Sequence, residues 1–248
     1  MDAKQLLNQA NKDYRTWGWK NNPFTLQPDP RVLVDMETET RDLILSINNR
    51  THSMIVGEMG TGKTTVLMWL KLALSGNYHC IYFSQPPRDI ISSMERELRK
   101  QGAFGILDRL FKVKLTIDKV EKVGKPILLL IDEAHEMDET TANTLKILSD
   151  KQNVVLVMAG QKSLQVKLEK FKALADRFVT KVTLNPMEPN LIETLIRARI
   201  SAVGGKSLDP LNATVISEVC ARAGGNPREA LRLCNMVINA VLAGEKLE

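Results

Sequence analysis

The sequence predicts an α/β fold in which a parallel sheet is sandwiched by helices and followed by a small helical domain. Three observations support this prediction. Short apolar runs alternate with helical segments from residue 53 to residue 184, and strands separated by helices form parallel sheets covered on both faces. A glycine-rich loop joins the first apolar run to the next helical segment, and after Pro186 only amphipathic helical patterns remain.

The expected strands are short apolar runs with helical segments between them. The run Ile127–Ile131 is unbroken and apolar, as a strand buried on both faces should be, so we expect it in the middle of the sheet. The expected strands are residues 53–56, 80–84, 127–131, 154–159 and 179–184, and the expected helices are residues 2–14, 36–49, 64–74, 191–203, 213–223 and 227–242.

These patterns divide the chain into an N-terminal arm at residues 1–35, a nucleotide-binding core at 36–186 and a helical lid at 187–248. No long Gly/Ser linker separates them, so we expect the parts to pack together. Aromatic side chains gather in the arm, and two interpretations are open: packing of the arm over the core, or stacking on bases. They are Trp17, Trp19 and Phe24.

Composition indicates an ordinary globular protein, with 248 residues, 44% hydrophobic and 25% charged. The formal net charge of +5 favours an anionic partner such as nucleic acid or nucleotide. Cys80, Cys220 and Cys234 are odd in number and lack metal-ligand spacing, which indicates reduced thiols and a cytoplasmic protein. We find neither a signal-peptide pattern nor an apolar run of about 20 residues, so we expect a soluble protein without a membrane span.

The clearest motif follows the first expected strand and opens a helix. Its pattern is G-x-x-x-x-G-K-[ST], in which glycines let successive backbone N–H groups point at one phosphate and the helix N-terminus adds partial positive charge. We expect Lys63 to reach the β- and γ-phosphates and the Thr64 hydroxyl to bind Mg²⁺. The predicted nucleotide-binding residues are Gly57, Glu58, Met59, Gly60, Thr61, Gly62, Lys63, Thr64 and Thr65.

Two carboxylates, Asp132 and Glu133, come directly after the apolar run that ends at Ile131. Open α/β sheets bind their ligands at the carboxyl ends of strands. We therefore expect Asp132 to hold the Mg²⁺ shell and Glu133 to act as general base toward a water that attacks the γ-phosphate. The alternative is an acidic N-cap for the short helix that follows.

The phosphate loop, Ile-Asp132-Glu133-Ala-His, Arg177 before the last strand and Gly224-Gly-Asn-Pro-Arg228 in the helical tail together resemble an AAA+ ATPase. The arm, with Gly18-Trp-Lys-Asn-Asn-Pro-Phe24 and Pro28-Asp-Pro-Arg31, looks like the ExeA and transposition-ATPase (TnsC, MuB) group, akin to archaeal Cdc6/Orc initiators. This resemblance implies a P-loop NTPase with a five-stranded parallel sheet, a helical lid, and bound ATP and Mg²⁺ at the edge of a neighbouring subunit.

The resemblance also implies roles for residues outside these motifs. Arg177 matches the arginine finger that acts on a neighbouring subunit's γ-phosphate, and Arg228 matches the lid arginine called sensor 2. Each is alternatively a surface arginine, near a helix end or paired with an acid. Gln161 matches the sensor 1 position, where many members carry Asn, Ser or Thr, and it either orients a water or is simply a polar residue at the end of a strand. Pro23 and Phe24 are the nearest matches for adenine contact.

His52 and His135 lack a second ligand at metal spacing, so we interpret both as structural. Basic and acidic residues are interleaved between residues 88 and 125, which predicts either solvated helix faces or a DNA contact. The candidate phosphate contacts are Lys112, Lys114 and Lys119.

Three functions remain open at this point. The chain is an ATPase that assembles as a ring or filament of identical subunits on double-stranded DNA and signals to a transposase or replication factor; or it is an ExeA-like protein-remodelling ATPase; or it is a nucleotide-gated switch with little turnover. We expect the first function rather than the second, because ExeA-like proteins usually carry a membrane span and a wall-binding domain after the ATPase, whereas this sequence ends at Glu248.

Overall fold

The computed structural model describes residues 14–104 and 114–245, which divide into two compact units. The α/β unit comprises residues 36–59 and 63–184, and the helical unit comprises the described residues up to Asp35, Gly60–Gly62 and those from Asn185 onward. Apart from Tyr14, the helix expected at residues 2–14 lies outside the described residues. Within the described ranges, no helix has the length and apolarity that crossing a bilayer requires.

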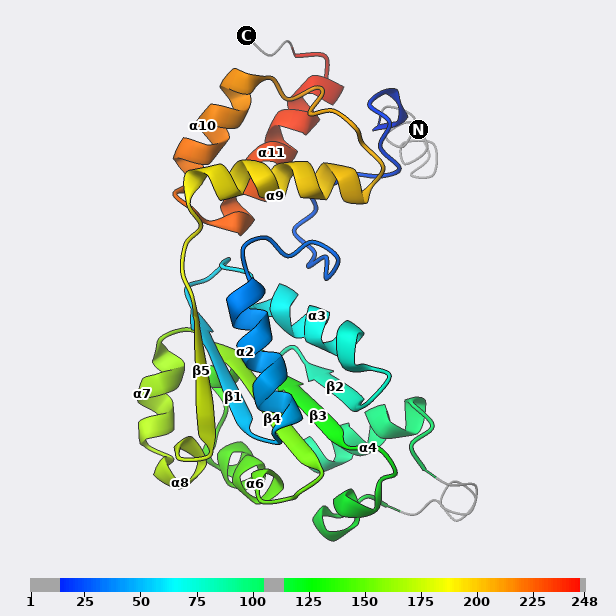
Figure 1. Cartoon of the computed structure of the whole chain (residues 1–248), viewed down its shortest axis with the longest axis vertical. Helices are drawn as coiled ribbons and strands as arrows, with labels where there is room; N and C mark the ends of the chain where they lie inside the picture. The colour runs from blue at the N-terminus through cyan, green and yellow to red at the C-terminus, as the bar shows by residue number, and fades with distance from the viewer. Residues whose placement is uncertain (1–13, 105–113, 246–248) are drawn as a thin grey trace. The chain divides into compact units, whose positions relative to one another are not determined.

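The α/β unit is built on a five-stranded sheet with the order β2-β3-β4-β1-β5 (Figure 1). All four strand pairs are parallel, as the alternation of strands and helices predicts. The strands are β1 (His52–Gly57), β2 (His79–Phe83), β3 (Ile127–Ile131), β4 (Val154–Gly160) and β5 (Phe178–Leu184).

The prediction that Ile127–Ile131 forms the middle of the sheet is wrong. This strand, β3, is second in the order, and β4 occupies the central place. Every residue of both strands is buried, because helices cover both faces at each of these positions. An unbroken apolar run therefore indicates burial on two faces, and here both β3 and β4 meet this condition.

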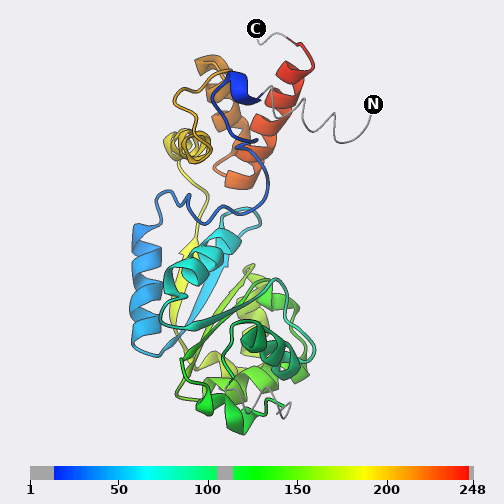
Figure 2. The ribbon, with the colours of Figure 1, turned by 90° about the vertical axis from the view of Figure 1, so that its right-hand side faces the viewer.

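The direction of each crossover between strands determines which face of the sheet its helix covers. The connection from β1 to β2 runs across the sheet in the opposite direction to the later ones, so right-handed crossovers put its helix on the opposite face from theirs (Figures 1 and 2). One face carries α2 (Glu37–Asn48) and α3 (Lys63–Leu74), and the other carries α4 (Ile90–Lys100), α6 (Glu139–Ser149), α7 (Ser163–Glu169) and α8 (Lys172–Ala175). Short 3₁₀ turns, η1 (Ile117–Lys122) and η2 (Ala134–Glu136), flank β3.

Three helices form the body of the helical unit: α9 (Pro189–Ala202), α10 (Ala213–Ala223) and α11 (Pro227–Leu242). The described part of the arm packs on these helices. Trp19 and Phe24 are 1% and 0% exposed and lie edge to face, with ring centroids 5.8 Å apart, in a core with Ile192, Ile196 and Cys234. Trp19 and Phe24 are therefore core side chains of this unit, and the partly buried Trp17 packs against them.

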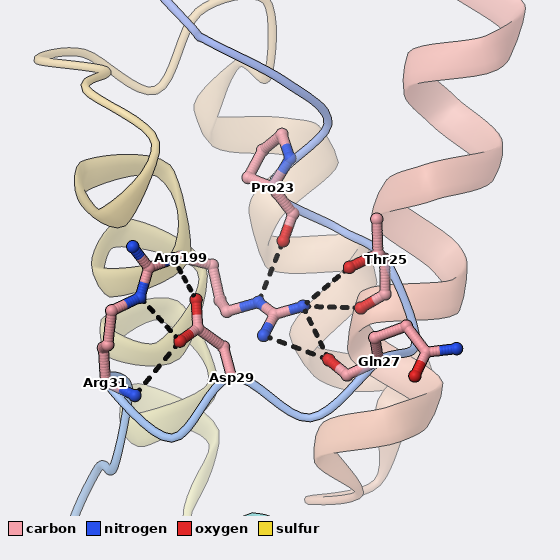
Figure 3. A network of polar contacts seen from close by, with 6 residues as sticks. All are labelled: Pro23, Thr25, Gln27, Asp29, Arg31 and Arg199. Carbon is pink, nitrogen blue, oxygen red and sulfur yellow. Dashed lines mark hydrogen bonds and ion pairs between the residues drawn. The ribbon is translucent and has the colours of Figure 1, made fainter. Parts of the chain in front are cut away.

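A buried arginine ties the arm to α9 (Figure 3). Arg199 is 5% exposed, and its guanidinium donates to the backbone carbonyl oxygens of Pro23 at 2.8 Å, Thr25 at 2.5 Å and Gln27 at 3.4 Å. Burial lowers the pKa of Arg199, and the nearby Asp29 carboxylate opposes that shift. One cation therefore satisfies carbonyls of an irregular segment that has no strand or helix of its own.

The sequence Gly224-Gly-Asn-Pro-Arg228 connects α10 to α11, and each of its first four residues has a local structural reason. Gly224 ends α10 in the left-handed conformation with φ 55°, and the Asn226 side chain caps α11 by accepting from the backbone N–H of Arg228 at 3.0 Å. Gly225 has φ 78°, its carbonyl accepts from Met187 N–H at 2.7 Å, and Pro227 is the first residue of α11. Arg228 is thereby placed in the first turn of α11.

Candidate nucleotide site at the carboxyl edge of the sheet

Lys63, predicted to bind phosphate, and the predicted metal ligands Thr64 and Asp132 lie at one edge of the α/β unit. Because β3, β4 and β1 are adjacent and parallel, their carboxyl ends, at Ile131, Gly160 and Gly57, lie side by side. Open α/β sheets bind ligands at this edge.

The glycine-rich loop leaves β1 at Gly57 and enters α3 at Lys63. Gly60 and Gly62 have φ values of 88° and 101°, a region that side-chain-bearing residues rarely adopt, which explains the glycines at these positions. Lys63 is 5% exposed, and its ammonium group donates to the carbonyl oxygens of Gly57 at 2.8 Å and Glu58 at 2.7 Å. Burial lowers the pKa of Lys63, while the carboxylates of Glu133, Asp132 and Glu58 oppose the shift.

Thr64 and Asp132 form the oxygen pair expected of a Mg²⁺ site. The Thr64 hydroxyl donates to Asp132 Oδ2 at 2.5 Å, across 68 positions of sequence. Asp132 is 3% exposed, and its other oxygen accepts from the backbone N–H of Glu133 at 3.0 Å. Hydroxyl and carboxylate oxygens are the ligands Mg²⁺ prefers, and this ion keeps most of its shell as water and phosphate, so the donor set fits it.

Glu133 has an unusual backbone conformation, with φ 46° and ψ 36°. A left-handed residue other than glycine costs about 1 kcal/mol or more, and such residues gather at functional sites. Glu133 precedes η2, yet its side chain forms no capping hydrogen bond. The side chain thus does not perform the capping role that was the alternative to a catalytic one.

Two side chains at this edge were missed as functional candidates. The Tyr82 hydroxyl donates to Asp132 Oδ2 at 3.3 Å, and burial, followed by the Asp132 charge, raises the pKa of Tyr82. His135 Nδ1 lies 3.3 Å from Glu133 Oε2. Tyr82 could have been noticed in the sequence as a polar residue near the end of a strand. Linking it to Asp132, however, requires the knowledge that β2 is next to β3 in the sheet.

Gln161 directly follows β4, and Thr65 lies in the first turn of α3, so both are at the same edge of the sheet. The Gln161 and Met59 side chains are exposed, the latter at 63%. The Glu58 carboxylate lies 3.5 Å from the Lys162 ammonium group, with both side chains largely exposed. The sensor role of Gln161 stays a prediction.

Arg177 lies at the opposite end of the sheet, directly before the first residue of β5. Its guanidinium donates to Asp150 Oδ1 at 2.8 and 2.6 Å and also to the Ala173 carbonyl. Because β5 has 7 residues, about 20 Å of strand separates Arg177 from the carboxyl edge. Arg177 therefore cannot serve the site of its own subunit without a large rearrangement.

Arg228, Pro23 and Phe24 belong to the helical unit. The Arg228 side chain is exposed, and its role stays a prediction. The ring of Phe24 is fully buried and cannot stack on a base, so an adenine contact from this residue is limited to its backbone. Of the predicted DNA contacts, Lys114 and Lys119 are exposed in the α/β unit, whereas Lys112 lies outside the described residues.

The three cysteines are free thiols. Burial raises the pKa of Cys80 to about 11 and that of Cys234 to about 12, which keeps these thiols protonated at neutral pH.

Comparison with known proteins adds a family match and a set of structural neighbours. Residues 47–168 match the AAA domain family, whereas a search of curated protein sequences returned no match. Among solved structures, the chain is similar to Cdc6p from Pyrobaculum aerophilum, with a TM-score of 0.67, 15% identity, and coverage of 90% of this chain and 66% of that one.

Two further structural neighbours have comparable scores. The Orc1 protein of Aeropyrum pernix, in complex with DNA, has a TM-score of 0.69 and 17% identity over 91% of this chain and 65% of its own. The RuvB Holliday junction branch migration motor of Thermotoga maritima has a TM-score of 0.60 and 17% identity over 89% and 68%. The chain spans about two-thirds of the length of these proteins. It has the AAA-type P-loop NTPase fold of Cdc6, Orc and RuvB.

Proposed function

We propose that this protein binds ATP with Mg²⁺ and hydrolyses the bond between the β- and γ-phosphates. The observation that carries the proposal is the meeting of Lys63, Thr64, Asp132 and Glu133 at one sheet edge, with Thr64 and Asp132 in direct contact. Mg²⁺ bound there supplies positive charge that offsets the charge developing on the phosphate oxygens.

The roles follow from the chemistry of each group. Lys63 provides a cation beside the phosphates, Thr64 and Asp132 hold the metal, and Glu133 takes a proton from the attacking water. The Glu133 side chain is 35% exposed, so water reaches its carboxylate, whereas Asp132 is buried. Gln161 and Arg228 are proposed to orient the water and to couple the lid to the γ-phosphate.

Calorimetry and phosphate release test this proposal. We expect Mg-ATP binding by the wild type and its loss in Lys63→Ala. We expect Glu133→Gln to keep binding but to lose turnover by about 100-fold or more, since general base catalysis contributes about 10²–10⁴-fold. Absence of Mg-ATP binding by the wild type would refute the nucleotide site, and equal phosphate release from the wild type and Glu133→Gln would refute the base assignment.

We further propose that ATP drives assembly of identical subunits on double-stranded DNA, with a transposase or replication factor as partner. The net charge of +5, the exposed Lys114 and Lys119, and the DNA-related structural neighbours, one of them solved in complex with DNA, support this proposal. The alternatives are a protein-remodelling ATPase similar to ExeA and a nucleotide-gated switch.

Duplex DNA binding, measured with and without a non-hydrolysable ATP analogue across a salt series, separates assembly on DNA from protein remodelling, and the phosphate-release measurement above tests the switch. Affinity should require the analogue and fall steeply with salt, because phosphate contacts release counterions. Replacing Lys114 and Lys119 together by Gln should reduce the slope of log affinity against log salt by about 2. DNA binding that is absent, or indifferent to salt, would favour the protein-remodelling alternative.

A further inference from the structure

His135 lies against the carboxylate that we propose as the general base. Its Nδ1 atom is 3.3 Å from Glu133 Oε2, with the two side chains 19% and 35% exposed. Nδ1 is buried and, within the described residues, forms no hydrogen bond. A buried imidazole nitrogen without a partner is costly, and a small rotation of either side chain would complete a charge-assisted hydrogen bond between them.

The main chain of His135 is anchored on two sides, which limits how far its ring can move. Its carbonyl oxygen accepts a hydrogen bond from Lys167 Nζ at 2.9 Å, so α7 holds the turn. Its backbone nitrogen lies against Gly160 at the end of β4, where an added Cβ would come within 3.4 Å of it. The neighbouring Ala134 is 0% exposed in the core of the α/β unit.

The orientation of the Glu133 carboxylate, by contrast, is not fixed by a hydrogen bond to its own turn. The Glu133 backbone is left-handed and its side chain forms no capping bond to η2. A carboxylate that rotates freely spends less time in the orientation that accepts a proton, and small misplacements of reacting groups reduce rates strongly.

We propose that His135 is a positioning residue for Glu133, with its Nδ1–H held toward Oε2 so that Oε1 stays available to the attacking water. Lys167 is the support that holds His135 in place. This inference rests on the proposed role of Glu133 as base. Because the contact is to Glu133 and not to nucleotide, its loss should lower kcat and leave KM for ATP unchanged.

Two substitutions of His135 test the proposal. His135→Leu removes the donor and keeps an apolar body, whereas His135→Asn keeps an N–H near the Nδ1 position. We expect His135→Leu to lower kcat by about 10- to 100-fold, the effect of one charge-assisted hydrogen bond, with KM within about twofold of wild type. His135→Asn should recover most of the loss, which a purely steric role would not produce.

A double-mutant cycle distinguishes failure of this inference from failure of the proposed function. In single-turnover measurements, His135→Leu should add little to Glu133→Gln, because both remove the same contribution. Additive losses, or a wild-type kcat in His135→Leu beside an inactive Glu133→Gln, would overturn the positioning role alone. A wild-type rate in Glu133→Gln would overturn the function on which it rests.

Two further measurements do not depend on His135 variants folding. Lys167→Met should lower kcat about threefold, whereas Lys170→Met, an exposed control one residue past α7, should not. Nitrogen-15 NMR of the nucleotide-free protein should find the Nδ1–H tautomer of His135 in the wild type and its loss in Glu133→Ala. A tautomer that is insensitive to Glu133→Ala, or equal rates for the two lysine variants, would contradict the proposal.

Discussion

At the scale of single residues, side chains far apart in sequence determine the chemistry of this protein. The Thr64 hydroxyl donates a hydrogen bond to Asp132 Oδ2, and the Tyr82 hydroxyl donates a second one to the same carboxylate oxygen. These contacts fix the orientation of the Asp132 carboxylate, which in the proposed function would hold Mg²⁺, and such preorganisation reduces the reorganisation required during reaction.

His52 is a structural counterpart to His135. Its Nε2 lies 3.0 Å from the Ser149 carbonyl, and its Nδ1 accepts from Leu156 N–H at 3.1 Å, so the ring is neutral with the proton on Nε2. It joins the start of β1 to α6 and β4, which agrees with the structural role predicted for it.

A pH dependence of stability follows for His52. Burial lowers the pKa of His52 below its ordinary value of 6.5, so the unfolded chain takes up the proton first as the pH falls. The stabilisation by His52 is complete above about pH 6.5 and decreases below it, by at most about 1.4 kcal/mol per pH unit. Denaturant unfolding at pH 8, 6.5 and 5 should find His52→Gln less stable than wild type at pH 8, with the difference shrinking toward pH 5. A constant difference would contradict this assignment.

At the scale of elements, short connections decide where functional side chains are placed. Gly224, Gly225, Asn226 and Pro227 end one helix and begin the next, which puts Arg228 in the first turn of α11. The residue types that match a lid arginine motif in the sequence are therefore also fully explained by the turn between two helices, which requires them.

Adjacent glycines in this connection provide a matched pair of substitutions. An alanine Cβ at Gly225 would lie 2.4 Å from the Met187 carbonyl oxygen, whereas one at Gly224 would meet nothing within 4 Å, and both residues have positive φ. We expect Gly224→Ala to lower the free energy of unfolding by about 1 kcal/mol through strain, and Gly225→Ala by about 2–4 kcal/mol because the backbone must move. Circular dichroism during denaturation measures both, and equal losses would indicate that no close contact exists at Gly225.

At the scale of the whole molecule, the position of Arg177 bears on whether the proposed nucleotide site is shared between subunits. It lies at the amino end of β5, while Asp132 and Glu133 follow the carboxyl end of β3. If Arg177 stabilises the transition state, it does so in a neighbouring subunit. In the isolated chain it pairs instead with Asp150, so assembly would exchange one anionic partner for another.

Mixing two inactive variants tests this arrangement. Arg177→Ala keeps the base and loses the proposed finger, whereas Glu133→Gln keeps the finger and loses the base. Each alone should lose about 100-fold or more in turnover, and a 1:1 mixture should recover about a quarter of the wild-type rate, since a quarter of the interfaces would then be complete. Asp150→Asn serves as the control and should stay active. A mixture as inactive as its components would mean that Arg177 only pairs with Asp150.

The sequence by itself determined the α/β class, the five strands within one residue at each end, the helices α9, α10 and α11, and the glycine-rich loop and acidic pair. Each of these depends on short-range chemistry: apolar periodicity, turn residues, and glycines that a loop conformation requires. Only the tertiary structure decided that β4 rather than β3 is central, that Trp19 and Phe24 are buried against α9–α11, and that Tyr82 and His135 contact the two carboxylates. Sheet order and side-chain contacts join residues dozens of positions apart, and no local pattern encodes which of them will meet.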